Sequence, residues 1–350
     1  MSDRLLYERD GLPIFQNRMY GTKSEAVDAP QGNIRLVEDL ATGLVHNSAF
    51  EPDRVVYDEH YQNEQGLSKK FSDHLEEVAQ IISAKLGHKD LIEVGCGKGH
   101  FVDLMTARGA DITGFDPAYE GSNPAIRKVF FGAGDQMSGD GIILRHVLEH
   151  ISDPVAFLRE MALANGKRGR IYIEVPCFEW IAENRSWFDI FYEHVNYFRL
   201  GDFRRMFGNV IECGHLFGGQ YIYVVAELSS IRTPVRDASD PADLPTDFAA
   251  DLFDEGGKDL PSVIWGGASK GVIYSLSRAR AGHPVDAVID INPAKQGKYL
   301  AGTGLLVEAP GAVLERFPDG THIAVMNSNY LTEIRQLAGD QFVCIGIDHV

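Results

Sequence analysis

The sequence contains few cysteines, and none of them are paired at a metal-binding spacing. Cys96, Cys177, Cys213 and Cys344 are scattered over 350 residues without a Cys-x-x-Cys motif. Such spacing provides neither a zinc cluster nor a disulfide framework, and it is typical of proteins from a reducing compartment. We therefore expect a cytoplasmic protein.

Basic residues and long apolar runs are also scarce. Lys and Arg number 33 against 50 Asp and Glu, for a formal net charge of −17. This balance argues against broad binding to nucleic acid or to anionic membranes, because phosphate contacts need clustered cations. No stretch approaches the ~18 apolar residues of a membrane span, and the first ten residues hold no apolar signal core. We expect a small-molecule partner, while the oligomeric state does not follow from the sequence.

The composition and patterning of the sequence divide the chain into four segments. Residues 1–67 read as an N-terminal cap region, 68–230 as one α/β domain, 231–260 as a linker rich in Ser, Thr, Pro and Asp, and 261–350 as a second α/β domain. Because strand and helix signals alternate, we expect parallel sheets covered by helices. The first domain has predicted strands at 91–95, 111–116, 127–131, 141–145, 170–175 and 220–226, and predicted helices at 68–86, 101–108 and 147–164.

The most informative motif is a glycine-rich turn with an acidic residue downstream. An apolar strand runs into Gly95, Gly97 and Gly99, and Asp116 ends the next apolar run. Glycines at a strand-to-helix turn let the backbone approach a bound nucleotide. An acidic residue about twenty positions further on can accept the ribose hydroxyls. The spacing differs from Gly-x-Gly-x-x-Gly, which disfavours a pyrophosphate cofactor; an ordinary glycine-rich turn is the alternative.

The run Glu93-x-Gly-x-Gly-x-Gly resembles the first motif of class I S-adenosylmethionine-dependent methyltransferases. The stretch from Ile142 to Pro154 is similar to the fourth strand and following helix of that class. The resemblance implies a Rossmann-like catalytic domain that binds S-adenosyl-L-methionine and releases S-adenosyl-L-homocysteine. It places these residues at the cofactor: Tyr61, Phe71, Glu93, Gly95, Cys96, Gly97, Asp116, Pro117, Arg145 and His146.

The stretch Phe191-Tyr-Glu-His-Val-Asn-Tyr-Phe198 resembles the Glu-His motif of nucleotide-sugar C-methyltransferases. That resemblance implies that His194 is the general base, with Glu193 and Tyr192 beside it. The alternative is a structural role, in which Glu193 and His194 only hold the surrounding aromatic segment in place as a lid.

The same family has a C-terminal Rossmann-like domain that helps to hold the sugar nucleotide. Its matching pieces include the turn 266–271, and the resemblance implies substrate contacts from Ser269, Lys270, Asn327 and Tyr330. The turn is also compatible with a plain tight turn or, given Asp290 downstream, with a dinucleotide site.

Two features depart from this family. Members often carry an N-terminal zinc module, but Asp39 and Thr42 stand here where thiolates would sit, so we predict that this zinc is absent. Moreover, Phe191 occupies the position of a family Tyr, and Tyr192 directly precedes Glu193. The substrate and the proton chemistry therefore stay open.

The segment His146-Val-Leu-Glu-His150 matches His-x-x-Glu-His, the pattern of a class of zinc proteases. Two His four residues apart share a helix face and could ligate one metal. However, the motif follows a strand, and the sequence shows no third ligand. We predict no metal, with His146 facing the cofactor and His150 packing structurally.

These observations predict methyl transfer to a small polar metabolite. The favoured reaction is C-methylation of a nucleotide-activated keto sugar in a biosynthetic pathway, with His194 as the base. The alternatives are an O- or N-methyltransferase acting on another small metabolite, a catalytically silent protein that binds S-adenosylmethionine, and an oxidoreductase that uses the second glycine-rich turn.

Overall fold

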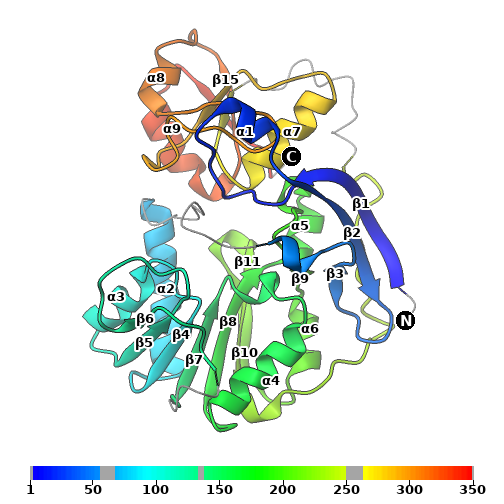
Figure 1. Ribbon diagram of the computed structural model, residues 1–350, viewed down its shortest axis with the longest axis vertical. Helices are drawn as coiled ribbons and strands as arrows, with labels where there is room; N and C mark the ends of the chain where they lie inside the picture. The colour runs from blue at the N-terminus through cyan, green and yellow to red at the C-terminus, as the bar shows by residue number, and fades with distance from the viewer. Residues whose placement is uncertain (1–2, 56–67, 133–137, 250–262, 349–350) are drawn as a thin grey trace.

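The computed structural model describes residues 3–55, 68–132, 138–249 and 263–348, whose strands form three sheets (Figure 1). The central sheet has the order β10-β11-β8-β7-β4-β5-β6. Its neighbours are parallel from β6 to β8, whereas β11 pairs antiparallel with both β8 and β10. Its strands are β4 (Leu91–Val94), β5 (Ile112–Phe115), β6 (Ile126–Arg127), β7 (Gly141–Arg145), β8 (Arg170–Pro176), β10 (Val210–Leu216) and β11 (Tyr221–Glu227). The predicted α/β class is confirmed.

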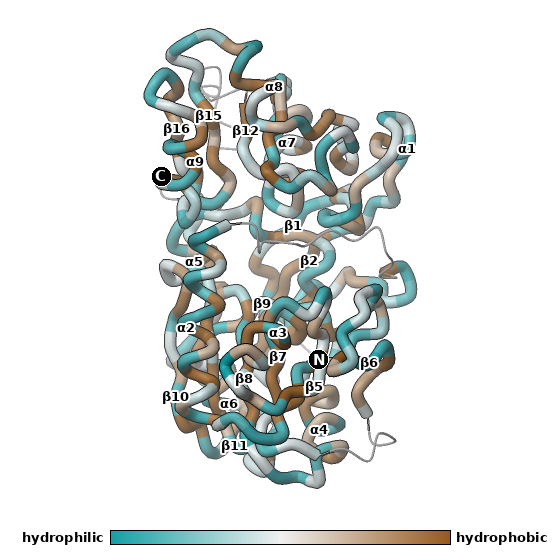
Figure 2. Tube along the Cα trace, turned by 90° about the vertical axis from the view of Figure 1, so that its left-hand side faces the viewer, coloured by the Kyte–Doolittle hydropathy of each residue, from teal (hydrophilic) through white to brown (hydrophobic). Residues whose placement is uncertain are grey.

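Alternate residues of the central strands face two different apolar layers. Ile143 packs in the same cluster as residues of α2 (Lys69–Lys85) and α3 (His100–Ala107). Its neighbours Ile142 and Leu144 belong to the cluster that contains α4 (Pro154–Ala164) and α6 (Leu200–Met206). A sheet covered on both faces needs strands that are apolar at every position, as β7 is. Figure 2 shows hydrophobic stretches along the strands, β7 among them, and hydrophilic stretches on many of the loops.

One predicted helix agrees with the structure and another does not. The Ser68 side chain caps α2 by accepting the N–H of Phe71, at the predicted start of that helix. The single helix predicted over 147–164 is wrong. A 3-10 turn, η2 (Leu148–His150), is separated from α4, which starts at Pro154 with Asp153 as its cap. Pro at the first helical position lacks the N–H that would continue an earlier helix.

The N-terminal sheet combines three strands from the first 47 residues with one short strand from much later in the chain. It has the order β1-β2-β3-β9 and is antiparallel, with β1 (Asp3–Pro13), β2 (Gln31–Asp39), β3 (Val45–Asn47) and β9 (Asn196–Tyr197). Asp39 and Thr42 accept the backbone N–H groups of Ala41 and Leu44 at 2.7 and 3.3 Å. Their side chains thus brace the turn between β2 and β3.

The segment between β1 and β2 reaches the C-terminal domain. Its helix α1 (Lys23–Val27) lies beside C-terminal elements (Figure 1), and the N–H of Gly302 donates to the Ala26 carbonyl at 2.7 Å. Tyr20 forms a β-bridge with Tyr299. The region predicted as a cap is therefore packed against both other domains.

The C-terminal domain contains a five-stranded parallel sheet of order β14-β13-β12-β15-β16. Its strands are β12 (Val263–Trp265), β13 (Ala287–Ile289), β14 (Val307–Glu308), β15 (His322–Val325) and β16 (Val343–Gly346), and its helices are α7 (Lys270–Arg280), α8 (Pro310–Leu314) and α9 (Leu331–Ala338). This is a Rossmann-like arrangement whose strand order reverses beside β12, where such sheets bind ligands.

The described part of the predicted linker packs across the N-terminal sheet. Arg236 is paired with the buried Glu38 at 3.0 Å, and Phe248 contacts Tyr7 edge to face. The remaining helical elements are α5 (Phe178–Glu183) and the 3-10 turns η1 (Pro52–Arg54), η3 (Trp187–Asp189), η4 (Phe217–Gly219), η5 (Leu228–Ser230) and η8 (Ser328–Tyr330). Within the described ranges, no helix has both the length and the apolar character that crossing a membrane requires.

The contact between Gly32 and Tyr192 gives a test of this packing. A Cβ on Gly32 would lie 2.7 and 2.8 Å from two ring carbons of Tyr192 and closer still to a third. We expect Gly32→Ala to destabilise the protein by about 1–3 kcal/mol, since the buried ring has to shift. Denaturant unfolding measures this. The control is Gly311→Ala in α8, where a Cβ meets nothing within 4 Å; equal stability of both variants would contradict the packing.

Candidate active site

The glycine-rich turn after β4 forms one wall of a cavity of about 410 Å³. Gly97 has a φ of 54°, in the left-handed region that favours glycine, and a Cβ there would meet nothing within 4 Å. The Gly97 N–H donates to Asp116 Oδ2 at 2.8 Å, and the N–H of Ala118 donates to Asp116 Oδ1 at 2.8 Å. Among the described residues, no side chain therefore covers the backbone of Gly97 at the cavity, and the Asp116 carboxylate next to it is held in place by two hydrogen bonds.

Glu93 and Arg145 form a buried pair under this turn. Arg145 Nη1 lies 3.6 Å from Glu93 Oε1, and the guanidinium lies over the ring of Phe101. Burial raises the pKa of Glu93 to about 7, although Arg145 opposes the shift. Within the described residues, Glu93 Oε2 has no hydrogen-bond partner. An open glycine turn and an unsatisfied buried acceptor at one cavity fit a polar cofactor such as S-adenosylmethionine.

A buried charge network supports the floor of the site. His146, at the end of β7, lies 3.0 Å from Glu174 and 3.4 Å from Glu149. Burial alone would lower the pKa of His146, but the neighbouring carboxylates of Glu149 and Glu174 outweigh it and raise the pKa to about 9. Glu174 also accepts from the Tyr172 hydroxyl at 2.7 Å and contacts His74 Nε2 at 3.1 Å. His146 therefore carries a positive charge at neutral pH.

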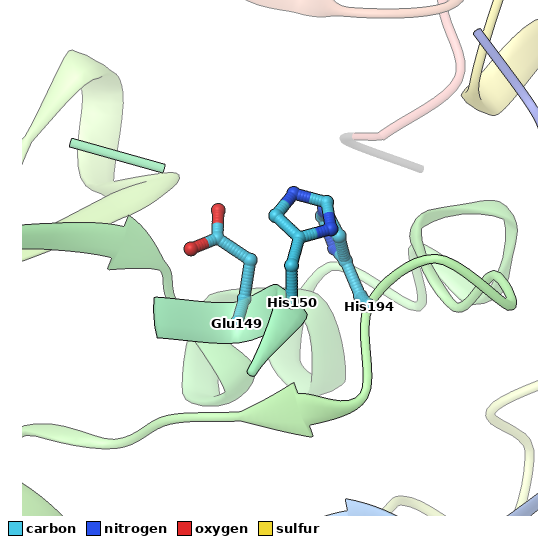
Figure 3. Close-up of side chains that lie close together, drawn as sticks. All are labelled: Glu149, His150 and His194. Carbon is cyan, nitrogen blue, oxygen red and sulfur yellow. The ribbon is translucent and has the colours of Figure 1, made fainter. Parts of the chain in front are cut away.

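The loop before β9 brings His194 to the same cavity, against His150 (Figure 3). The two ring centroids are 5.0 Å apart. Burial lowers the pKa of His194 well below its usual range, and the neighbouring His150 and His146 add to the effect. His194 is consequently a neutral imidazole at neutral pH. His150, expected from the sequence to pack structurally, instead lines the cavity.

Glu193 and Tyr192 point away from this cavity. The Glu193 carboxylate is buried and accepts the backbone N–H groups of Gln16 and Asn17 at 2.7 and 3.4 Å. The Tyr192 hydroxyl accepts the N–H of Glu51 at 2.9 Å. Neither side chain lines the cavity, so both hold the N-terminal region in place beside His194.

The C-terminal glycine-rich turn forms the opposite wall of the same cavity. The Gly267 N–H donates to Asp290 Oδ2 at 2.9 Å, and the N–H of Asn292 donates to Asp290 Oδ1 at 2.8 Å. Asp116 accepts the same two kinds of bond. In each domain the acid accepts one N–H from a glycine in the turn after the first strand and another from the residue two positions after the acid itself.

The predicted substrate residues also line the cavity, but their polar groups are engaged. The Lys270 ammonium lies 2.7 Å from the buried Asp189. Ser269 Oγ donates to Asn17 Oδ1 at 2.7 Å, and the Asn327 side-chain amide donates to Gln220 at 2.8 Å. Tyr330 packs edge to face on Phe217, and burial raises its pKa. An anionic ligand would therefore have to compete with Asp189 for Lys270.

The cavity gathers most of the residues predicted from the sequence. Those that line it are Phe71, Glu93, Gly95, Cys96, Gly97, Arg145, His146, His194, Ser269, Lys270, Asn327 and Tyr330. Asp116 and Pro117 lie outside its lining, and Tyr61 lies outside the described residues. Sequence reasoning missed Glu149 and Gln220 as lining residues; the only signal for Glu149 was the His-x-x-Glu-His pattern.

Comparison with known proteins identifies one domain of this chain. Residues 57–210 match a family model described as a methyltransferase domain. This segment holds the glycine-rich turn, Asp116, His194 and the five parallel strands of the central sheet. The chain therefore contains a methyltransferase domain. The search of curated proteins finds no match.

Several solved methyltransferases resemble the chain over less than half of its length. An S-adenosylmethionine-dependent methyltransferase from Archaeoglobus fulgidus has 17% identity, covering 46% of this chain and 97% of that chain, with a TM-score of 0.35. The 1,6-didemethyltoxoflavin-N1-methyltransferase from Burkholderia thailandensis has 14% identity, covering 45% and 80%, with a TM-score of 0.34. Such low scores decide nothing about this chain's substrate.

A substitution of Asp116 tests whether the glycine-rich turn after β4 binds the cofactor. We expect Asp116→Ala to weaken the binding of S-adenosylhomocysteine by about tenfold or more, because a charged acceptor and the bond that orients Gly97 are both lost. Titration calorimetry measures the affinity. Asp111→Ala is the control: Asp111 is exposed and precedes β5, at the opposite end of that strand from Asp116, so this variant should bind normally. Unchanged affinity in Asp116→Ala would contradict the assignment.

Proposed function

We propose that the protein methylates a carbon of a nucleotide-activated keto sugar held between its two glycine-rich turns. The observation that carries this proposal is the single cavity shared by both turns, each with the same glycine-to-acid hydrogen bonds. A sheet edge of this kind binds nucleotides at the carboxyl ends of its strands. One turn would serve the methyl donor and the other the nucleotide of the acceptor.

On the donor side, the backbone of Gly95 and Gly97 would lie against the cofactor and Asp116 would accept its ribose hydroxyls. When bound, S-adenosylmethionine supplies an activated methyl group on a sulfonium. The chain then has to align donor and acceptor and remove one proton. The positively charged His146 sits at this wall, where it can stabilise negative charge that develops on the acceptor.

On the acceptor side, Asp290 would hold the ribose of the sugar nucleotide as Asp116 holds that of the donor. Ser269, Lys270, Asn327 and Tyr330 surround this part of the cavity. The sugar ring would then extend from β12 toward β7, which brings its reacting carbon near His194. The family resemblance of the sequence favours the same class of acceptor.

The proton acceptor in this proposal is His194. Its ring is neutral at neutral pH and lines the cavity. In C-methylation it would remove a proton beside the ketone; in the alternative O-methylation it would remove a hydroxyl proton, and an N-methylated acceptor would likewise lose its proton there. Glu193 contributes by fixing the backbone around His194.

The acceptor class is tested by ligand binding to the wild-type protein saturated with S-adenosylhomocysteine. We expect nucleoside diphosphate sugars to raise the melting temperature and to show saturation-transfer signals, and Asp290→Ala to weaken that binding by about tenfold while S-adenosylhomocysteine binds normally. The control is the exposed Asp286→Ala. If no nucleotide or nucleotide sugar binds, the proposed acceptor class is wrong.

The base is tested by turnover with the acceptor found in that screen. We expect His194→Ala to lower kcat by about 10²–10⁴-fold with nearly unchanged affinity for S-adenosylhomocysteine. Transfer of a labelled methyl group measures turnover. Full activity in this variant would return His194 to a packing role, and absence of transfer in the wild-type protein would favour a silent binding protein.

A further inference from the structure

We propose that Glu149, His150 and His194, which all line the cavity, form a binding site for a divalent transition-metal cation. One ligand atom from each residue lies within 4.8 Å of the others. In Figure 3 Glu149 and His150 rise together from η2, and His194 approaches from a separate loop. Two imidazoles and one carboxylate are a common ligand set for such ions, and they leave coordination positions open.

The backbone holds the two ligand-bearing segments together before any ion binds. The N–H of Val195 donates to the Glu149 carbonyl at 2.7 Å. The Asn196 side-chain amide donates to the Ile151 carbonyl at 2.6 Å. Ligand atoms around one such ion are about 3–3.5 Å apart, so only small side-chain rotations would close the site.

His150 is oriented as a metal ligand requires. Its Nδ1 lies 2.8 Å from the Glu193 carbonyl oxygen, which can only accept, so Nδ1 carries the proton and Nε2 carries the lone pair of the neutral ring. Metal-ligating His residues usually donate their other N–H to a backbone carbonyl or carboxylate in this way.

Glu149 supplies an independent sign of a missing ligand. It is 1% exposed, and neither carboxylate oxygen has a hydrogen-bond partner among the described residues, although His146 lies at 3.4 Å. A buried carboxylate without hydrogen bonds is costly. A cation held by Glu149 and the two imidazoles would satisfy it.

The proposed ion changes the role of His194. Its ring cannot bind a cation and a proton through the same lone pair, so in the metal-loaded protein His194 is a ligand. The ion would then face the acceptor and polarise a carbonyl or hydroxyl oxygen, which makes the neighbouring proton easier to lose. The site itself is independent of which acceptor the protein uses.

The test is metal titration of chelator-treated, full-length protein with Zn²⁺ by calorimetry and with Co²⁺ by visible absorption. We expect one tight site per chain, with an absorption spectrum of Co²⁺ bound to nitrogen and oxygen. We expect Glu149→Gln, His150→Ala and His194→Ala each to weaken that site by about tenfold or more. Retained binding of S-adenosylhomocysteine shows that each variant is folded.

His215→Ala is the matched control. His215 lies with Cys177 and Glu179 in a second group that could hold an ion, but the Cys177 sulfur accepts the N–H of Trp180 at the start of α5. We expect this variant to keep the tight site. Loss of the site in His215→Ala alone, or no stoichiometric binding to the wild-type protein, would overturn the proposal.

Chelation separates this proposal from the one above. If activity on the identified acceptor needs the ion, His194 acts as a ligand; if the protein binds no ion and still turns over, His194 remains the base. Failure of every nucleotide sugar to bind would leave the metal titration unaffected, so the two proposals fail independently.

Discussion

The buried carboxylate of Glu193 joins three parts of the chain. It accepts the N–H groups of Gln16 and Asn17, and the Gln16 carbonyl accepts the N–H of Ser269 at 3.1 Å. The N-terminal segment is therefore held between the loop that carries His194 and the C-terminal glycine-rich turn. Because a buried charge must keep its hydrogen bonds, this contact has little freedom to change. It sets the separation of the two nucleotide-type turns and makes one cavity of them.

The carboxyl ends of the central strands concentrate charge at the edge of an apolar sheet. Glu174, His146 and Glu149 alternate in sign, and the last two line the cavity above the buried Glu174. In a low dielectric each charge depends on its neighbour, so removing one would leave another uncompensated. The candidate site and the stability of the fold consequently depend on the same few side chains.

Most of the elements that were predicted correctly depend on local interactions. The periodicity of α2, the glycine-rich turn with Asp116 downstream, and β7 are all found where the sequence places them. The split between η2 and α4 was also a local feature, since Pro154 after Asp153 is a helix start. The N-terminal sheet was not predictable. Its strand β9 pairs with β3 from a distant part of the chain, and a strand of only two residues is too short to show an alternating pattern.

The sequence alone determined the glycine-rich turn with its downstream acid and the presence of two α/β domains. These features depend on the spacing of residues that are close together in the chain. Only the tertiary structure decided that both turns open into one cavity, that Tyr192 and Glu193 face the N-terminal region, and that His194 meets His150 and Glu149. Those outcomes depend on backbone hydrogen bonds between segments far apart in the chain. Residues 192 and 193 lie in a turn closed by the bond from the His194 N–H to the Phe191 carbonyl, so the order of the residues could not show which side chains face the cavity.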